Sequence, residues 1–93
     1  MKHYIIVKFI SDFDYVKELD KINNLFNKAL EIDGVNRIDI YRSNSSLSNR
    51  YDLMIKMELT KEGLINFDNS SIHSKWKSDY GKYIESKTIF DCD

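Results

Sequence analysis

The segment from His3 to Ile10 constrains the fold more than any other part of the chain, because it is apolar on both faces. In an extended strand, alternate side chains point to opposite sides. One side carries His3, Ile5, Val7 and Phe9, and the other carries Tyr4, Ile6, Lys8 and Ile10. Such a strand must be covered twice, by helices on one side and by another surface on the other. A chain of 93 residues has little material for a second cover, which favours a second copy of itself.

The rest of the chain predicts strands and helices in the order β-α-β-β-α-β. We expect a helix from the turn at 11–14 to about Glu31, ended by Gly34, since glycine tolerates the left-handed conformation common at helix ends. Thr60 is expected to cap a short helix through Phe67. The remaining segments are a strand at 35–42, a polar loop at 43–50, a strand at 51–59, a second helical pattern at 72–84 and a closing strand at 86–92.

Periodicity predicts which side chains of these elements face the core. The first helix has apolar residues three and four apart, which form one stripe: Val16, Leu19, Ile22, Phe26, Ala29 and Leu30. The third strand alternates, and its inward set is Tyr51, Leu53, Ile55, Met57 and Leu59. The last helical pattern places Ile72, Trp76 and Tyr80 together. Each element therefore offers one apolar side to a shared core.

This order of elements predicts an α+β fold, a ferredoxin-like sandwich with a four-stranded antiparallel sheet and helices on one face. Residues 1–93 are expected to form a single domain, because the chain is too short for two cores. The apolar open face of the sheet would be buried if two sheets faced each other. We therefore expect a homodimer that closes into a dimeric α/β barrel.

Composition argues against several partners and locations. The net charge of −1 provides no basic field for nucleic acid or an anionic membrane, and no apolar run approaches the roughly 20 residues that span a bilayer. The third strand lacks the basic-Gly-aromatic run of RNA-recognition domains. The single Cys92 cannot form an internal disulfide, and the first ten residues lack a cleavable signal pattern. We expect a cytoplasmic protein that binds neither nucleic acid nor membrane.

Two histidines are the first candidates for chemistry, because imidazole exchanges protons near neutral pH. His73 lies in the segment that links two helical patterns, and His3 lies on the inward side of the first strand. One cysteine and two distant histidines cannot form a zinc site of known spacing, and no glycine-rich phosphate loop is present. The carboxylates of Asp12, Asp14, Asp91 and Asp93 are interpreted as solvated or capping groups. We expect no metal and no cofactor.

Five short motifs in the right order resemble the stress-responsive A/B barrel family, the Dabb domain, over nearly the whole chain. They are His3-Tyr4-Ile5-Ile6-Val7-Lys8-Phe9, Gly34-Val35, Tyr51-Asp52-Leu53, the pair Phe67 and His73 six residues apart, and Ile89-Phe90-Asp91. The resemblance implies a small homodimer with a ferredoxin-like fold. It also implies a stress-related or ligand-binding role.

The same resemblance implies a pocket and a candidate base. In cofactor-free polyketide cyclases of this family, a His at the position of His73 acts as the base, and a Tyr at the position of Phe67 orients it. The residues that match the pocket are His3, Leu53, Phe67, His73, Trp76 and Tyr80, with Leu53 standing where the cyclase has a further His. Two functions stay open: binding of a small hydrophobic ligand, or catalysis as a cofactor-free lyase, cyclase or monooxygenase on an aromatic or polyketide-like substrate, with His73 as general base.

Overall fold

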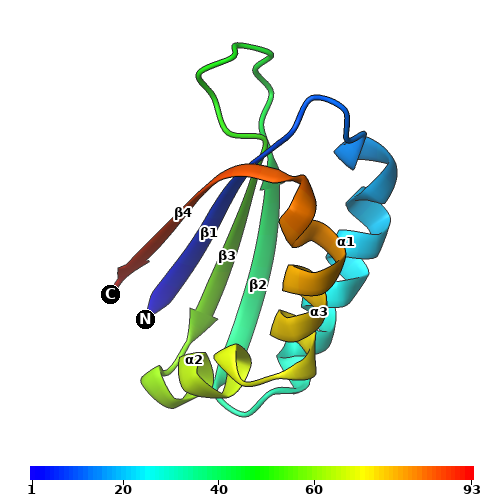
Figure 1. Ribbon diagram of the computed structural model, residues 1–93. Coiled ribbons are helices and arrows are strands. Elements are labelled where there is room, and N and C mark those ends of the chain that lie inside the picture. Colours follow the sequence, from blue (N-terminus) through cyan, green and yellow to red (C-terminus); the bar gives the residue numbers. More distant parts are fainter.

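A computed structural model describes residues 1–93 as a four-stranded antiparallel sheet with helices on one face (Figure 1). The sheet order is β2-β3-β1-β4. The strands are β1 (Lys2–Phe9), β2 (Val35–Arg42), β3 (Leu53–Leu59) and β4 (Ile84–Cys92). The helices are α1 (Leu19–Asn27), α2 (Lys61–Asp68) and α3 (Ser71–Tyr80), with 3-10 turns η1 (Tyr15–Glu18), η2 (Lys28–Glu31) and η3 (Gly81–Tyr83). The predicted α+β, ferredoxin-like class is confirmed.

The core lies between the helices and the two central strands. Alternate residues of β1 and β3 are buried on the helix side, as the period of two predicts: His3, Ile5, Val7 and Phe9 from β1, and Leu53, Ile55, Met57 and Leu59 from β3. They pack against Ile22 and Phe26 of α1 and against Phe67 and Trp76 of α2 and α3. His3 is the only polar side chain in this buried set.

The predicted stripe of the first helix is wrong at both ends. Val16 and Leu30 are exposed, whereas Leu25, which the stripe omitted, is buried. The helical stretch begins and ends with the 3-10 turns η1 and η2. A 3-10 turn has about 3.0 residues and an α turn about 3.6. The two ends are therefore rotated relative to α1, and an apolar pattern counted with one period loses its phase there.

Tyr51 also departs from its predicted inward position. Strand β3 begins at Leu53, so the alternation does not extend back to Tyr51. Its phenol lies 2.7 Å from the Thr88 hydroxyl on β4. Thr88 pairs with Ile6 of β1 and belongs to the sheet face opposite the helices. Tyr51 thus bridges across that face instead of entering the core.

Two glycines allow α2 to lie directly against the start of β2. Gly34 has φ of 90°, and its carbonyl accepts a hydrogen bond of 2.8 Å from the Thr60 amide. The Thr60 hydroxyl accepts one of 2.9 Å from the Gly63 amide, which confirms the predicted N-cap. A Cβ on Gly63 would lie only 2.5 Å from the Gly34 carbonyl carbon. This contact fixes where α2 begins, and it therefore also fixes the positions of Phe67 and Asp68 at the end of α2.

The open face of the sheet is apolar in its middle and polar or charged toward both ends. Strand register aligns its side chains in three rows: Tyr41, Met54, Ile6 and Thr88; then Asp39, Lys56, Tyr4 and Phe90; then Arg37, Glu58, Lys2 and Cys92. Arg37 pairs with Asp39 at 2.8 Å and with Glu58 at 3.7 Å. Beyond the first of these rows, Lys8 pairs with Ser86, so the apolar side chains lie in the middle of this face. None of the helices combines the length and apolar character that crossing a membrane requires.

Candidate functional site

Strand β4 lies at the sheet edge, where β1 is the only element with which it makes extensive contact. In Figure 1, β4 and α3 both leave the η3 turn and run apart. A cleft of about 300 Å³ lies between them, which we call the β4–α3 cleft. Its lining residues are His3, Ile5, Leu64, Asp68, His73, Trp76, Lys77, Lys87, Ile89 and Asp91.

His3 enters the cleft from β1 and is held by a carboxylate of the neighbouring strand. Its Nδ1 lies 2.5 Å from Asp91 Oδ1, because the register places Asp91 opposite His3. Asp91, interpreted from the sequence as a solvated or capping group, is 44% exposed and is in addition the partner of His3. No buried side-chain nitrogen or oxygen lacks a partner, so the other ring nitrogen, Nε2, is reachable from the cleft or from solvent.

His73 enters the cleft from the first turn of α3. The Ser70 hydroxyl caps this helix and accepts a hydrogen bond of 3.2 Å from the His73 amide. The ring Nδ1 lies 3.1 Å from the Asp68 carbonyl oxygen at the end of α2. A carbonyl can only accept, so a neutral His73 carries its proton on Nδ1 and offers Nε2 as an acceptor. A neutral His3 likewise donates its Nδ1 proton to the Asp91 carboxylate and offers Nε2 as an acceptor.

Buried aromatic rings pack against the two imidazoles on the core side of the cleft. Phe67 is fully buried, with its centroid 5.2 Å from that of His73 and 6.5 Å from that of His3. Trp76 is 3% exposed and packs edge-on against Phe26 at 5.0 Å. Phe67 has no hydroxyl and cannot orient His73 by a hydrogen bond. The Asp68 carbonyl does so instead, which the identity of residue 67 alone could not show.

The structure brings together four of the six residues predicted for the pocket and places two elsewhere. His3, His73 and Trp76 line the cleft, and Phe67 lies directly below. Leu53 is a core residue paired with Val7, four positions along β1 from His3. Tyr80 lines a separate hollow with Phe13, Glu18, Lys21, Asp79 and Tyr83. There, burial together with the carboxylates of Glu18 and Asp79 raises the pKa of Tyr80 above its ordinary value.

Seven cleft residues were not singled out from the sequence as pocket residues, namely Ile5, Leu64, Asp68, Lys77, Lys87, Ile89 and Asp91. Strand β4 pairs Lys87, Ile89 and Asp91 with the inward residues of β1, and Thr88 and Phe90 with residues of the open face. Its position at the sheet edge was not predicted. At an edge without a covering helix, the inward side of a strand lines a cleft instead of the core.

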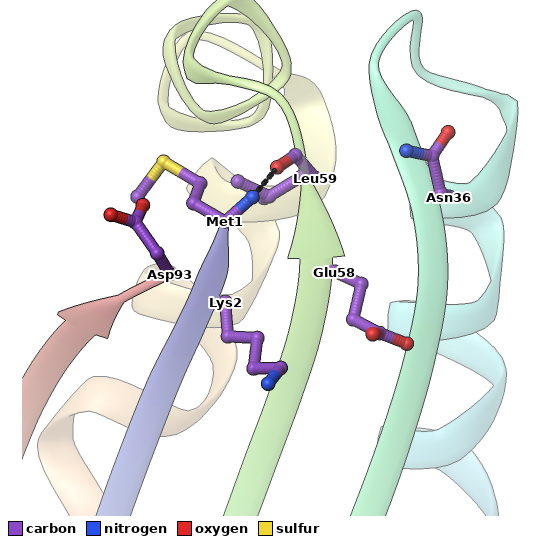
Figure 2. A pocket seen from close by; sticks show the side chains of 6 residues that line it. All are labelled: Met1, Lys2, Asn36, Glu58, Leu59 and Asp93. Carbon is purple, nitrogen blue, oxygen red and sulfur yellow. Dashed lines mark hydrogen bonds between the residues drawn. The ribbon is translucent and has the colours of Figure 1, made fainter.

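A second hollow lies at the end of the sheet where both chain ends meet. Figure 2 shows Met1 and Asp93 side by side above β1, with Lys2 and Glu58 below them. The Met1 amine donates a hydrogen bond of 2.8 Å to the Leu59 carbonyl. The hollow measures about 410 Å³, and its other lining residue is Asn36. It contains no imidazole, and no group of three or more His, Cys, Asp or Glu side chains is placed to hold a metal ion anywhere in the structure.

Comparisons with known proteins identify the architecture. A Dabb family protein with a ferredoxin-like fold from Mesorhizobium loti superposes with a TM-score of 0.73 at 14% identity, covering 99% of this chain and 93% of that chain. The chain has the fold of a Dabb protein. This agreement confirms, at the level of the fold, the resemblance seen in the sequence. No protein-family model matches the sequence, and no curated protein matches it.

Two further structures share the fold at similarly low identity. One is a dimeric protein of unknown function from Bacteroides fragilis, with a TM-score of 0.75 and 15% identity over 99% of this chain and 93% of that chain. The other is a hydroxynitrile lyase from Passiflora edulis, with a TM-score of 0.75 and 10% identity over 96% of this chain and 87% of that chain. The fold thus occurs both in an enzyme and in a protein without an assigned activity.

Proposed function

We propose that this protein is a homodimer of the Dabb type that binds a small, largely apolar molecule in the β4–α3 cleft. One observation carries the proposal: His3 of β1 lines the same cleft as His73 and Trp76 of α3, although the two elements are far apart in the sequence. Small-molecule sites are typically concave, mostly apolar and equipped with a few convergent polar groups. Here Ile5, Ile89 and Trp76 supply the apolar surface, and two imidazole Nε2 atoms supply hydrogen-bond acceptors.

Ligand-observed NMR with a library of small aromatic compounds tests the binding site. Ile89 is 46% exposed on the cleft wall, so Ile89→Trp should fill the cleft without disturbing the core. Ile65→Trp is the matched control, because Ile65 is 60% exposed on α2, does not line the cleft and lies outside the proposed dimer face. We expect saturation transfer with the wild type and with Ile65→Trp, and its loss with Ile89→Trp. Binding that survives in Ile89→Trp would place the ligand elsewhere.

The homodimer is supported by the apolar middle of the open sheet face. Ile6 and Met54 lie in the centre of that face, and Phe90 is 57% exposed beside Tyr4, with ring centroids 6.3 Å apart. Contiguous apolar surface of this kind is commonly an interaction site, and a two-fold axis pairs like with like. The dimeric state of the Bacteroides fragilis protein points the same way. A second copy is therefore the proposed cover.

Sedimentation equilibrium tests the dimer. The wild type should sediment at twice the chain mass of 11.0 kDa. Ile6→Glu should sediment as a monomer, because the proposed interface would have to bury an unpaired carboxylate. Val16→Glu is the control, since Val16 is an exposed apolar residue on the helix side of the molecule. A monomeric wild type would refute the proposal.

A cofactor-free enzyme is the second candidate, favoured by the state of the imidazoles. Both Nδ1 atoms face oxygen acceptors, which leaves Nε2 of His73 as a lone-pair acceptor at the cleft. A general base needs such a nitrogen within hydrogen-bond reach of the substrate proton. In this reading, His73 abstracts a proton from an aromatic or polyketide-like substrate and His3 orients it.

His73→Ala distinguishes catalysis from a structural role. If His73 is the base, turnover should disappear while the melting temperature barely changes, because the side chain is only partly buried. His73→Gln keeps a polar group of similar reach and should be equally inactive, since it cannot accept a proton at neutral pH. Unchanged turnover in both variants, or a large loss of stability in His73→Ala, would contradict the assignment.

A further inference from the structure

We propose that the ligand of the β4–α3 cleft is an acid with an apolar body, whose carboxylate binds between Lys77 and Lys87 and whose far end carries a hydroxyl that donates to an imidazole Nε2. This inference rests on the proposed ligand-binding function and specifies its chemistry. It depends on how charged and apolar side chains are distributed along the cleft.

The two lysines stand on opposite walls of the cleft and have no ionic partner. Lys77 belongs to α3 and Lys87 to β4, and both line the cleft. No carboxylate lies within 4.0 Å of either ammonium group, whereas Lys75, on the same helix as Lys77, pairs with Asp79 at 3.1 Å. Two lysines on opposite walls, neither paired with a carboxylate, create a local positive potential in a protein whose net charge is −1.

The acidic residues of the cleft lie toward its other end. Asp91 is already engaged by His3 at 2.5 Å. Asp68 lies at the end of α2, before α3 begins, and Lys77 lies near the opposite end of α3. On β4, Lys87 pairs with Val7 of β1 and Asp91 pairs with His3. The cleft therefore has two ends. Lys77 and Lys87 lie at one end, and the imidazoles with Asp68 and Asp91 lie at the other.

The separation indicates the size of the ligand. Four residues of strand between the levels of Asp91 and Lys87 span about 13 Å, and one helical turn between His73 and Lys77 spans about 6 Å. Between the two ends, Ile5, Ile89 and Trp76 form an apolar middle. A molecule with one aromatic ring and a short alkyl chain fits this spacing. Its carboxylate would meet the lysines while its far oxygen meets the imidazoles.

Calorimetric titration with three probes of similar shape tests the inference. The probes are 4-(4-hydroxyphenyl)butanoate, its primary amide, and 4-phenylbutanoate, which lacks the hydroxyl. Trp76 is the only tryptophan of the chain and lines the cleft, so its emission should change on binding and report the location. We expect the carboxylate to bind about tenfold more tightly than the amide, because two partly exposed charge pairs each contribute modestly. 4-Phenylbutanoate should bind more weakly than the hydroxylated acid.

Three variants assign the preference to the lysines. Lys77→Gln and Lys87→Gln should each reduce the tenfold preference, and the double variant should abolish it while the amide binds as before. Lys75→Gln is the control and should keep the tenfold preference for the acid. Raising the salt concentration should narrow the preference for the acid in the wild type and in Lys75→Gln but have no effect on the double variant, because screening weakens exposed charge pairs.

The outcomes separate this inference from the proposed function. Equal binding of acid and amide to the wild type, with a change in Trp76 emission, would overturn the acid preference and leave a neutral-ligand cleft. A preference that persists in the double variant would overturn the role of the lysines. Failure of all three probes to bind at millimolar concentration would overturn the inference. If the library screen also showed no saturation transfer with the wild type that Ile89→Trp removes, the proposed function would fail with it.

Discussion

Gly63→Ala should destabilise the protein strongly, although it adds a single methyl group. The new Cβ would lie 2.5 Å from the Gly34 carbonyl carbon and 2.9 Å from its Cα, and nearer still to its carbonyl oxygen. All three are backbone atoms, which cannot rotate away as a flexible side chain can. The substitution must therefore push α2 away from the start of β2.

Two contributions set the expected decrease in the free energy of unfolding. Overpacking a tight contact costs about 1–3 kcal/mol. Moving α2 also weakens the 2.8 Å hydrogen bond from the Thr60 amide to the Gly34 carbonyl, and a hydrogen bond of this kind contributes about 1 kcal/mol. We expect the free energy of unfolding to fall by about 3 kcal/mol in total. For a domain of this size the melting temperature should then fall by about 12–24 °C.

Thermal and urea unfolding followed by circular dichroism measures the effect. Gly81→Ala is the matched control, because a Cβ there meets nothing within 4 Å and its φ of −54° suits any residue. The control should be neutral or stabilised by up to about 1 kcal/mol. Both variants must be compared at one protein concentration, since dimerisation couples stability to concentration. Equal melting temperatures for the two variants would refute the close approach of α2 and β2.

Three further changes probe other contacts. Thr60→Ala should lower the free energy of unfolding by about 1 kcal/mol in urea titrations, because the cap of the Gly63 amide is lost. Asp52→Ala should cost about 1–2 kcal/mol in the same assay, because the Phe9 amide loses its 2.8 Å partner. The pKa of Tyr80 is raised in the folded protein, so its phenol ionises first in the unfolded chain. The contribution of Tyr80 to the free energy of unfolding is therefore fully present below pH 10.0 and is lost as the pH rises above it. Tyr80→Phe should show a shallower decline between pH 9 and 11, and identical slopes would contradict this.

The sequence predicted the fold well where one period governs a whole element. The inward residues of β1 followed from alternation alone, and Gly34 and Thr60 marked helix boundaries through their known backbone preferences. Prediction failed where the period changes, as at Val16 in the 3-10 turn η1. It also failed at Tyr51, which lies just outside β3, because alternation has no meaning beyond the end of a strand.

The candidate site was harder to predict because it depends on register and strand order. Resemblance to a known family singled out His3, Phe67, His73 and Trp76, which do come together. The partner of His3 could not be recognised, because Asp91 is 88 residues away and meets it only when β4 pairs with β1 in one register. A single chain does not reveal that register. The Asp68 carbonyl that orients His73 is a backbone atom, and residue identity carries no information about it.

The position of β4 explains why one short strand serves two surfaces. The helices leave its inner side largely open, so that side exposes Ile89 and Lys87 to the cleft. Its other side contributes Thr88 and Phe90 to the open sheet face, where the second copy is proposed to bind. Because β4 has extensive contact only with β1, nothing on its free edge fixes its distance from α3. Burial of Phe90 against a second copy would hold the strand in place, and with it the wall of the cleft that carries Asp91.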